Sequence, residues 1–164
     1  MKKLILVFLI IFAGFIISCK EENLPHYPID DNRVFIKVLD EQGVDLLDQT
    51  QAKSYKANVI KIFYEREGQL EEFYNGGLTN MRRNFRIDPP ELDEKQHRMK
   101  LIIESEVKVI QWNELEADTL YSEIDYDEKY NKMSVRKVYH QGELKHSNIP
   151  ALSRREFTII KQRQ

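Results

Sequence analysis

The chain has 164 residues, with 25 Lys or Arg and 27 Asp or Glu, so its formal net charge is −2. Its length fits one domain, and the lack of a strong basic excess argues against a nucleic-acid-binding protein. The single cysteine excludes an intramolecular disulfide. Because 41% of the residues are hydrophobic, the chain can build a core and we do not expect wholesale disorder.

The first 18 residues have the organisation of a signal peptide. Lys2 and Lys3 precede an uncharged, largely apolar run at residues 4–17. That length is typical of the apolar region of a signal peptide, whereas a transmembrane helix needs about 20 apolar residues. Charged residues at 20–22 end the run abruptly. We therefore predict that residues 1–18 are removed.

Residues 16–19, Ile-Ile-Ser-Cys, resemble the lipobox of bacterial lipoproteins. In that class the cysteine thiol is diacylated, the peptide is cut just before it, and the new amino terminus is acylated. The resemblance implies that Cys19 is the lipidated first residue of the mature chain. Two or more acyl chains would hold it firmly in a membrane. The alternative is an ordinary secretory peptide, or an uncleaved anchor, in which Cys19 occurs by chance.

Residues 19–22, Cys-Lys-Glu-Glu, also resemble the signal that directs Bacteroidota lipoproteins to the outer face of the outer membrane. The resemblance implies a surface-exposed lipoprotein, with a periplasm-facing anchor as the alternative. Loss of residues 1–18 removes two lysines and no acidic residue, which leaves a net charge of −4. Residues 19–33 contain Pro25 and Pro28 and read as a flexible tether, about 45 Å long when extended.

Residues 34–164 are predicted to form one all-β domain. Alternating or β-branched segments predict strands at 34–39, 58–65, 70–74, 99–104, 107–112, 120–126, 133–139, 144–145 and 155–161. Residues 78–87 are ambiguous, because their apolar spacing fits a helix at first and a strand later. Turns recur every 8–12 residues, which is typical of an immunoglobulin-like or similar β-sandwich. We expect about eight or nine short antiparallel strands.

Several segments resemble uncharacterised Bacteroidota lipoproteins with a β-sandwich fold. They are residues 35–48, which include Asp-x-x-Gly-x-Asp-Leu-Leu-Asp, then 60–64, 112–113, 118–119 and the hairpin at 138–142. The usual Tyr-Asn-Gly turn of that family is His140-Gln141-Gly142 in this chain. The resemblance implies a sandwich over most of the mature chain, and it implies no particular activity.

Two groups of residues are candidate metal ligands. Asp40, Asp45 and Asp48 surround a glycine turn, and their carboxylates could hold Ca²⁺. The alternative is that they only form turns, since Asp side chains bond to nearby backbone N–H groups. His140 and His146 flank a hairpin and could bind zinc, but no third ligand lies at a useful spacing.

A basic cluster and several aromatic residues are candidates for ligand binding. Arg82, Arg83 and Arg86 could hold a sulfate, phosphate or acidic sugar through paired hydrogen bonds, or they could form a solvated face. Trp112, Tyr126 and Tyr130 could stack on sugar rings, but Trp112 ends a predicted strand and also fits a core position, as does Tyr139.

The chain carries none of the motifs of common catalytic sites. It contains no Gly-x-Ser-x-Gly, His-Glu-x-x-His, Walker or dinucleotide-binding sequence. We therefore expect a non-enzymatic, lipid-anchored envelope module that binds a glycan or a protein, with no cofactor besides the lipid. One alternative is an assembly protein that uses sheet-edge contacts. Another is a carboxylate-dependent glycoside hydrolase.

Overall fold

The computed structural model describes residues 32–78, 80–129, 132–147 and 154–162. The predicted signal peptide, Cys19 and most of the predicted tether lie outside these residues. Ten strands are present: β1 (Arg33–Asp40), β2 (Lys61–Arg66), β3 (Gln69–Glu72), β4 (Phe85–Asp88), β5 (Arg98–Ile102), β6 (Val107–Gln111), β7 (Ala117–Asp127), β8 (Lys132–His140), β9 (Glu143–Ser147) and β10 (Glu156–Lys161). No helix occurs in this part of the chain.

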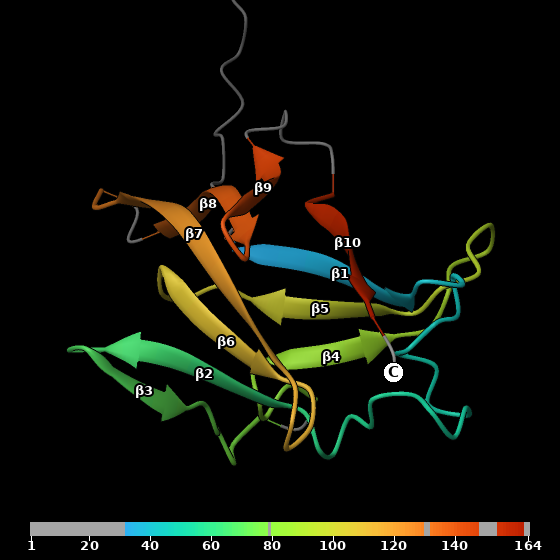
Figure 1. The fold of residues 1–164 in the computed structure, drawn as a ribbon. Coiled ribbons are helices and arrows are strands. Elements are labelled where there is room, and N and C mark those ends of the chain that lie inside the picture. Colours follow the sequence, from blue (N-terminus) through green and yellow to red (C-terminus); the bar gives the residue numbers. More distant parts are fainter. Residues whose placement is uncertain (1–31, 79, 130–131, 148–153, 163–164) are drawn as a thin grey trace, which may run out of the picture.

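The strands form two sheets that make a β-sandwich (Figure 1). One sheet has the order β10-β1-β5-β4, and the other has the order β3-β2-β6-β7-β8-β9. The all-β sandwich predicted from the sequence is confirmed. The prediction that all strands are antiparallel is wrong at one pair, because β1 and β10 are parallel. A tight hairpin forces neighbours to be antiparallel, but these two strands are joined through the rest of the chain.

The core lies between the inner faces of the two sheets. On β1, Val34, Ile36 and Val38 are fully buried and alternate with partly exposed residues. This period of two places one side of each strand toward the partner sheet. Fully buried residues on the other strands include Met99, Leu101, Ile62, Ile110, Leu120 and Val138. The alternation in the sequence therefore identifies the faces that pack together.

One predicted strand begins later than expected, and the segment left ambiguous at residues 78–87 is a turn followed by a strand. Residues 56–60 form a turn before β2, in which the N–H groups of Val59 and Ile60 both donate to the Lys56 carbonyl. Strong β-propensity at residues 58–60 is overridden there, and Val59 is exposed. Residues 81–84 also form a turn. It ends at Asn84, whose φ of 65° separates it from β4.

Two hairpin turns join neighbouring strands of the six-stranded sheet. Glu67 and Gly68 join β2 to β3, and Gln141 and Gly142 join β8 to β9. All four have positive φ, which is the backbone of the two-residue turn that suits twisted antiparallel strands. Only glycine adopts this conformation without cost, so each turn places a glycine at its second position.

A charge network covers the outer face of the four-stranded sheet. The Arg98 side chain is 2% exposed and forms ion pairs with Glu91 at 2.6 Å, Glu94 at 3.3 Å and Glu156 at 3.5 Å. Its guanidinium also lies over the Phe35 ring, 5.8 Å from the centroid. Glu91 and Glu94 belong to the segment before β5, and Glu156 begins β10. The network therefore joins the segment before β5 to strands β5 and β10. It does not extend over β4, at the other edge of the sheet.

Candidate functional site

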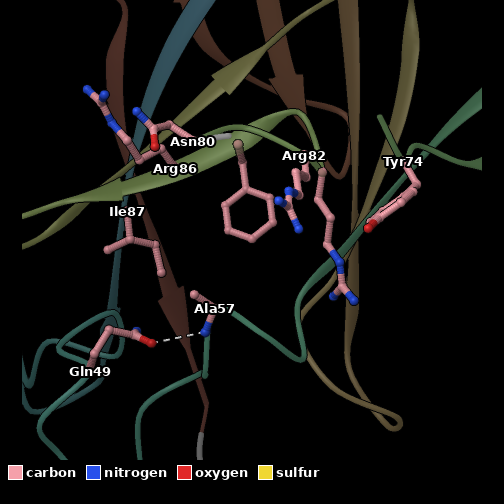
Figure 2. Close-up of a pocket in the computed structure, with 9 residues that line it drawn as sticks. Gln49, Ala57, Tyr74, Asn80, Arg82, Arg86 and Ile87 are labelled. Atoms are coloured by element: carbon pink, nitrogen blue, oxygen red, sulfur yellow. Dashed lines mark hydrogen bonds between the residues drawn. The ribbon is translucent and has the colours of Figure 1, made fainter. Parts of the chain in front are cut away.

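A cleft with a volume of about 460 Å³ lies beside strand β4 (Figure 2). It is lined by Gln49, Ala57, Tyr74, Asn80, Arg82, Arg83, Phe85, Arg86 and Ile87. All three arginines of the predicted basic cluster are among these residues. The structure therefore brings the predicted cluster together on a concave surface, which we call the arginine cleft.

The apolar part of the arginine cleft comes from β4 and from the segment before β2. Phe85 is 7% exposed, and Ile87 and Ala57 pack against the core. Figure 2 shows the side chains of Ile87 and Ala57 facing the same space from opposite walls. Gln49 fixes the second wall, because its Oε1 accepts from the Ala57 N–H at 2.9 Å and its Nε2 donates to two nearby carbonyls.

Arg83 is used to hold the fold. Its Nη1 donates to the carbonyl of Asn58 at 2.9 Å and to that of Ile60 at 2.7 Å. These carbonyls end the turn before β2, so Arg83 joins that turn to the segment before β4. A guanidinium committed to two backbone carbonyls has fewer donors left for a ligand.

Arg86 is partly neutralised by a carboxylate on its own strand. Its guanidinium donates to both oxygens of Asp88, and the side chain of Arg86 is 45% exposed. The hydrogen bond to Asp88 raises the pKa of Arg86. Arg86 thus contributes less net positive charge to the cleft than an isolated arginine would.

Arg82 is the arginine with the most donors to spare. Its Nε donates to the Leu78 carbonyl at 3.2 Å. Within the described part of the chain, Nη1 and Nη2 of Arg82 have no hydrogen-bond or ion-pair partner. Figure 2 shows Arg82 beside Tyr74 on one side of the cleft, and Tyr74 is 63% exposed. An available planar cation therefore lies next to an available aromatic ring.

The chemistry of the arginine cleft is that of binding. A guanidinium can bond to a carboxylate, sulfate or phosphate through two parallel N–H groups. The ring of Tyr74 offers a flat apolar face, and Phe85, Ile87 and Ala57 supply an apolar floor. None of the nine lining residues is Asp, Glu, His, Cys or Ser.

The aromatic residues predicted to bind sugars are not brought together. Trp112 is fully buried, and its ring stacks on Tyr55 with centroids 5.2 Å apart. Its core interpretation is confirmed, because no face of the ring is open to a ligand. Tyr126 is 56% exposed near the end of β7, away from the residues that line the cleft. Tyr130 lies outside the described residues.

The three aspartates predicted as calcium ligands each bond to nearby donors. Asp40 accepts the N–H groups of residues 42 and 44, and Asp48 accepts the N–H and hydroxyl of residue 50. Asp45 accepts from the backbone N–H and Nδ1 of His97, at 2.7 and 2.8 Å. The local contacts of Asp40 and Asp48, and that of Asp45 Oδ1 with the Leu47 N–H at 2.9 Å, are the turn-forming alternative, whereas the contact with His97 joins distant segments. The described ranges contain no group of three acidic, His or Cys residues that could hold a metal ion.

Asp118 is the centre of a buried polar cluster that the sequence did not single out as a site. It is 2% exposed on β7 and accepts from Trp112 Nε1 at 2.6 Å and from Gln141 Nε2 at 3.1 Å. Lys161 Nζ lies 2.6 Å from one carboxylate oxygen, and His140 Nε2 lies 3.1 Å from the other. His140, predicted as a possible zinc ligand, is therefore placed against a carboxylate.

The contacts of Asp118 link the two sheets. Burial raises the pKa of its carboxyl, but hydrogen bonds from Lys161, Trp112 and His140 outweigh burial and hold that pKa below its usual value. Lys161 belongs to β10 of the four-stranded sheet, whereas Asp118 belongs to the six-stranded sheet. The Lys161 ammonium also lies 5.6 Å from the centre of the Trp112 ring. The cluster is an inter-sheet clamp.

Lys108 is a second buried polar residue that the sequence did not single out. It is 1% exposed on β6, and its Nζ has no hydrogen-bond partner among the residues that the structure describes. The Lys108 ammonium lies over the Tyr64 ring, 5.6 Å from its centroid. Burial lowers the pKa of Lys108 to about 8, although the charge of Glu104 opposes this shift.

Comparison of the chain with protein-family models, curated proteins and solved structures finds no match. Over the residues that the structure describes, no helix is long and apolar enough to cross a membrane.

Proposed function

We propose that this protein is a lipid-anchored, non-catalytic binding module of the cell envelope, whose ligand is acidic and binds in the arginine cleft. The observation that carries this proposal is that Arg82, with free guanidinium donors, and the exposed ring of Tyr74 line the same cleft as the apolar side chains of Phe85, Ile87 and Ala57. An acidic group on a glycan or on a protein segment would satisfy those donors.

The different environments of the three arginines support a division of roles. Arg83 and Arg86 already bond to protein groups, and Arg83 thereby holds the turn before β2 against the segment before β4. Arg82 remains to contact the ligand. Three arginines within five residues also raise the local potential, which attracts an acidic ligand even where one guanidinium is paired.

The anchor is proposed from the N-terminal sequence alone. Its resemblance to a lipobox supports lipidation of Cys19, and residues 20–22 support an outer-membrane, cell-surface location of the kind found in Bacteroidota lipoproteins. A periplasm-facing anchor is the alternative location. The proposed tether would then hold the sandwich away from the lipid surface and leave the arginine cleft accessible.

Replacing Cys19 with Ser is expected to abolish metabolic labelling of the protein by radioactive palmitate and to shift it from the membrane to the soluble fraction. The thiol is the proposed acceptor of the lipid, and stable membrane attachment needs more than one acyl chain. In the wild-type strain, protease added to intact cells should degrade the protein. A wild-type protein that is unlabelled would contradict the anchor, and one that is labelled but resists protease would contradict surface exposure alone.

Arg82→Ala is expected to weaken the binding of acidic ligands at least tenfold while leaving the unfolding midpoint unchanged. A hydrogen bond to a charged group contributes about 1.5–3 kcal/mol, and Arg82 makes one backbone contact in the free protein. Calorimetry with the full-length protein in detergent would use an oligouronate, a sulfated oligosaccharide and an oligoglutamate peptide as probes.

Two control variants separate binding from folding. Arg136→Ala removes an exposed arginine of β8, in the six-stranded sheet, which pairs with Asp125 of the neighbouring strand β7. This variant should bind like the wild type. Arg83→Ala should lower the unfolding midpoint, because the carbonyls of Asn58 and Ile60 lose their donor. Equal affinity of the wild type and the Arg82 variant, or failure of all three probes to bind, would refute the proposed site.

Assembly through a sheet edge is the second candidate function. The observation that favours it is the exposure of all four residues of β3, which ends the six-stranded sheet. Leu70 on this strand is 55% exposed. An edge strand offers unpaired backbone groups to another chain.

A further inference from the structure

Strand β4 is an edge of the four-stranded sheet, and its pairing with β5 shows which of its backbone groups point away from β5. The Ile102 N–H donates to the Asn84 carbonyl at 3.1 Å, so this pair is hydrogen-bonded. In an antiparallel ladder, hydrogen-bonded pairs alternate with non-bonded pairs. The same register pairs Arg86 with Lys100 and Asp88 with Arg98. The N–H and C=O groups of Phe85 and Ile87 therefore point away from β5.

These four backbone groups face the arginine cleft. Phe85 and Ile87 both line it, and no strand within the described part of the chain pairs with β4 on that side. Across the described ranges, no hydrogen bond reaches the outward N–H or C=O of either residue. An edge with unpaired donors and acceptors is a template for a further strand. Here the edge lies within a cleft lined by Arg82 and Tyr74.

We propose that the partner of this cleft is a protein, and that an extended acidic segment of it adds antiparallel to β4 as a fifth strand. This inference rests on the proposed function and specifies its ligand. The outward groups of Phe85 and Ile87 are two residues apart on one strand, a separation of about 7 Å. An antiparallel peptide presents N–H and C=O groups at that same interval, whereas a saccharide has no backbone with this period.

The two faces of the added strand have different partners. Phe85 and Ile87 point toward the core, so peptide residues opposite them lie over the apolar floor and should be apolar. The intervening residues lie on the outer face with Arg86 and should be acidic. Asp88 already pairs with Arg86, so Arg82 is the main source of uncompensated charge. The preferred segment alternates acidic and apolar residues.

The test uses the full-length protein in detergent and the capped peptide Ser-Glu-Val-Glu-Val-Glu-Ser. In an antiparallel strand, the valines lie opposite Phe85 and Ile87, and their amides bond to β4, while the glutamate amides point outward. N-methylation of the two valine amides is therefore expected to weaken binding at least tenfold. N-methylation of the two amides that follow them, at the second and third glutamates, should leave affinity within threefold of the parent peptide.

Because the modification is made on the peptide, its effect does not depend on the folding of a protein variant. A scrambled peptide with the same charge and a sulfated oligosaccharide serve as controls, and Arg82→Ala is measured with each probe. If both methylated peptides bind equally, or only the saccharide binds in an Arg82-dependent manner, strand addition is wrong and the proposed function survives. If no acidic probe binds, both fail. A loss confined to the valine amides supports the inference.

Discussion

Replacing Asp118 with Ala is expected to destabilise the sandwich by about 3–5 kcal/mol, the usual cost of breaking a buried ion pair by removing one partner. The carboxylate accepts from Trp112, and Lys161 and His140 lie within 3.1 Å of it. Without it, the Lys161 ammonium, whose side chain is 11% exposed, would lack its partner. The Trp112 N–H would also lose its acceptor inside the core.

Urea unfolding followed by fluorescence measures this effect directly, because Trp112 is the only tryptophan and lies in the cluster. Asp125→Ala is the matched control: it also removes a carboxylate from β7, but from an ion pair that is about half exposed. Its cost should stay below about 1 kcal/mol. Similar losses in the two variants would show that the Asp118 cluster does not clamp the sheets.

The contribution of Asp118 should also depend on pH. Its pKa in the folded protein is lowered, and the carboxylate is the form that the cluster stabilises. The contribution is therefore fully present above the unfolded pKa of 3.8 and is lost as the pH falls through the lower folded pKa. The difference in unfolding free energy between the wild type and the Asp118 variant should shrink in that acidic range.

Lys108→Met is expected to stabilise the protein at neutral pH by about 2–3 kcal/mol. The lysine is 1% exposed with no hydrogen bond to its ammonium, and its pKa is lowered from 10.5 to about 8. A shift of that size corresponds to about 3 kcal/mol of penalty for keeping the charge in the folded protein. Methionine has a similar shape and can fill the same space without a charge.

The pH dependence distinguishes charge burial from packing. The unfolded state binds a proton at Lys108 up to pH 10.5, but the folded state releases it near pH 8. The contribution of Lys108 to the wild-type unfolding free energy should therefore increase as the pH rises from 8 to 10.5. The advantage of the Met variant should disappear over the same range. The exposed Lys53→Met variant is the control, and an equal effect there would contradict the explanation.

Most strands could be predicted because alternation is a local signal. The alternation of Val34, Ile36 and Val38 predicts both β1 and its inner face, and it can be recognised without the rest of the chain. The parallel pairing of β1 with β10 could not be predicted, since it depends on how the chain returns after building the second sheet. The burial of Lys108 could not be predicted either. Lys108 lies on the same face of β6 as Ile110, and because that face packs against the core, the lysine is buried together with the isoleucine.

The basic cluster was predictable because its three arginines are close in the sequence, but the cleft was not. Gln49, Ala57 and Tyr74 reach it from other segments, and only the tertiary structure places them there. The sequence also could not separate the roles of Arg82 and Arg83. That difference depends on two carbonyls, of Asn58 and Ile60, which lie more than 20 residues away.

The position of β1 has a mechanical consequence. It is the first strand of the described chain, yet it lies inside its sheet, between β5 and β10. A pull on the N-terminal end along β1 would load the hydrogen bonds to both neighbours in shear, so that many must break together. Strands at an edge, such as β9, can instead be peeled away one bond at a time. The domain is therefore built to resist force applied from the side on which the tether is proposed.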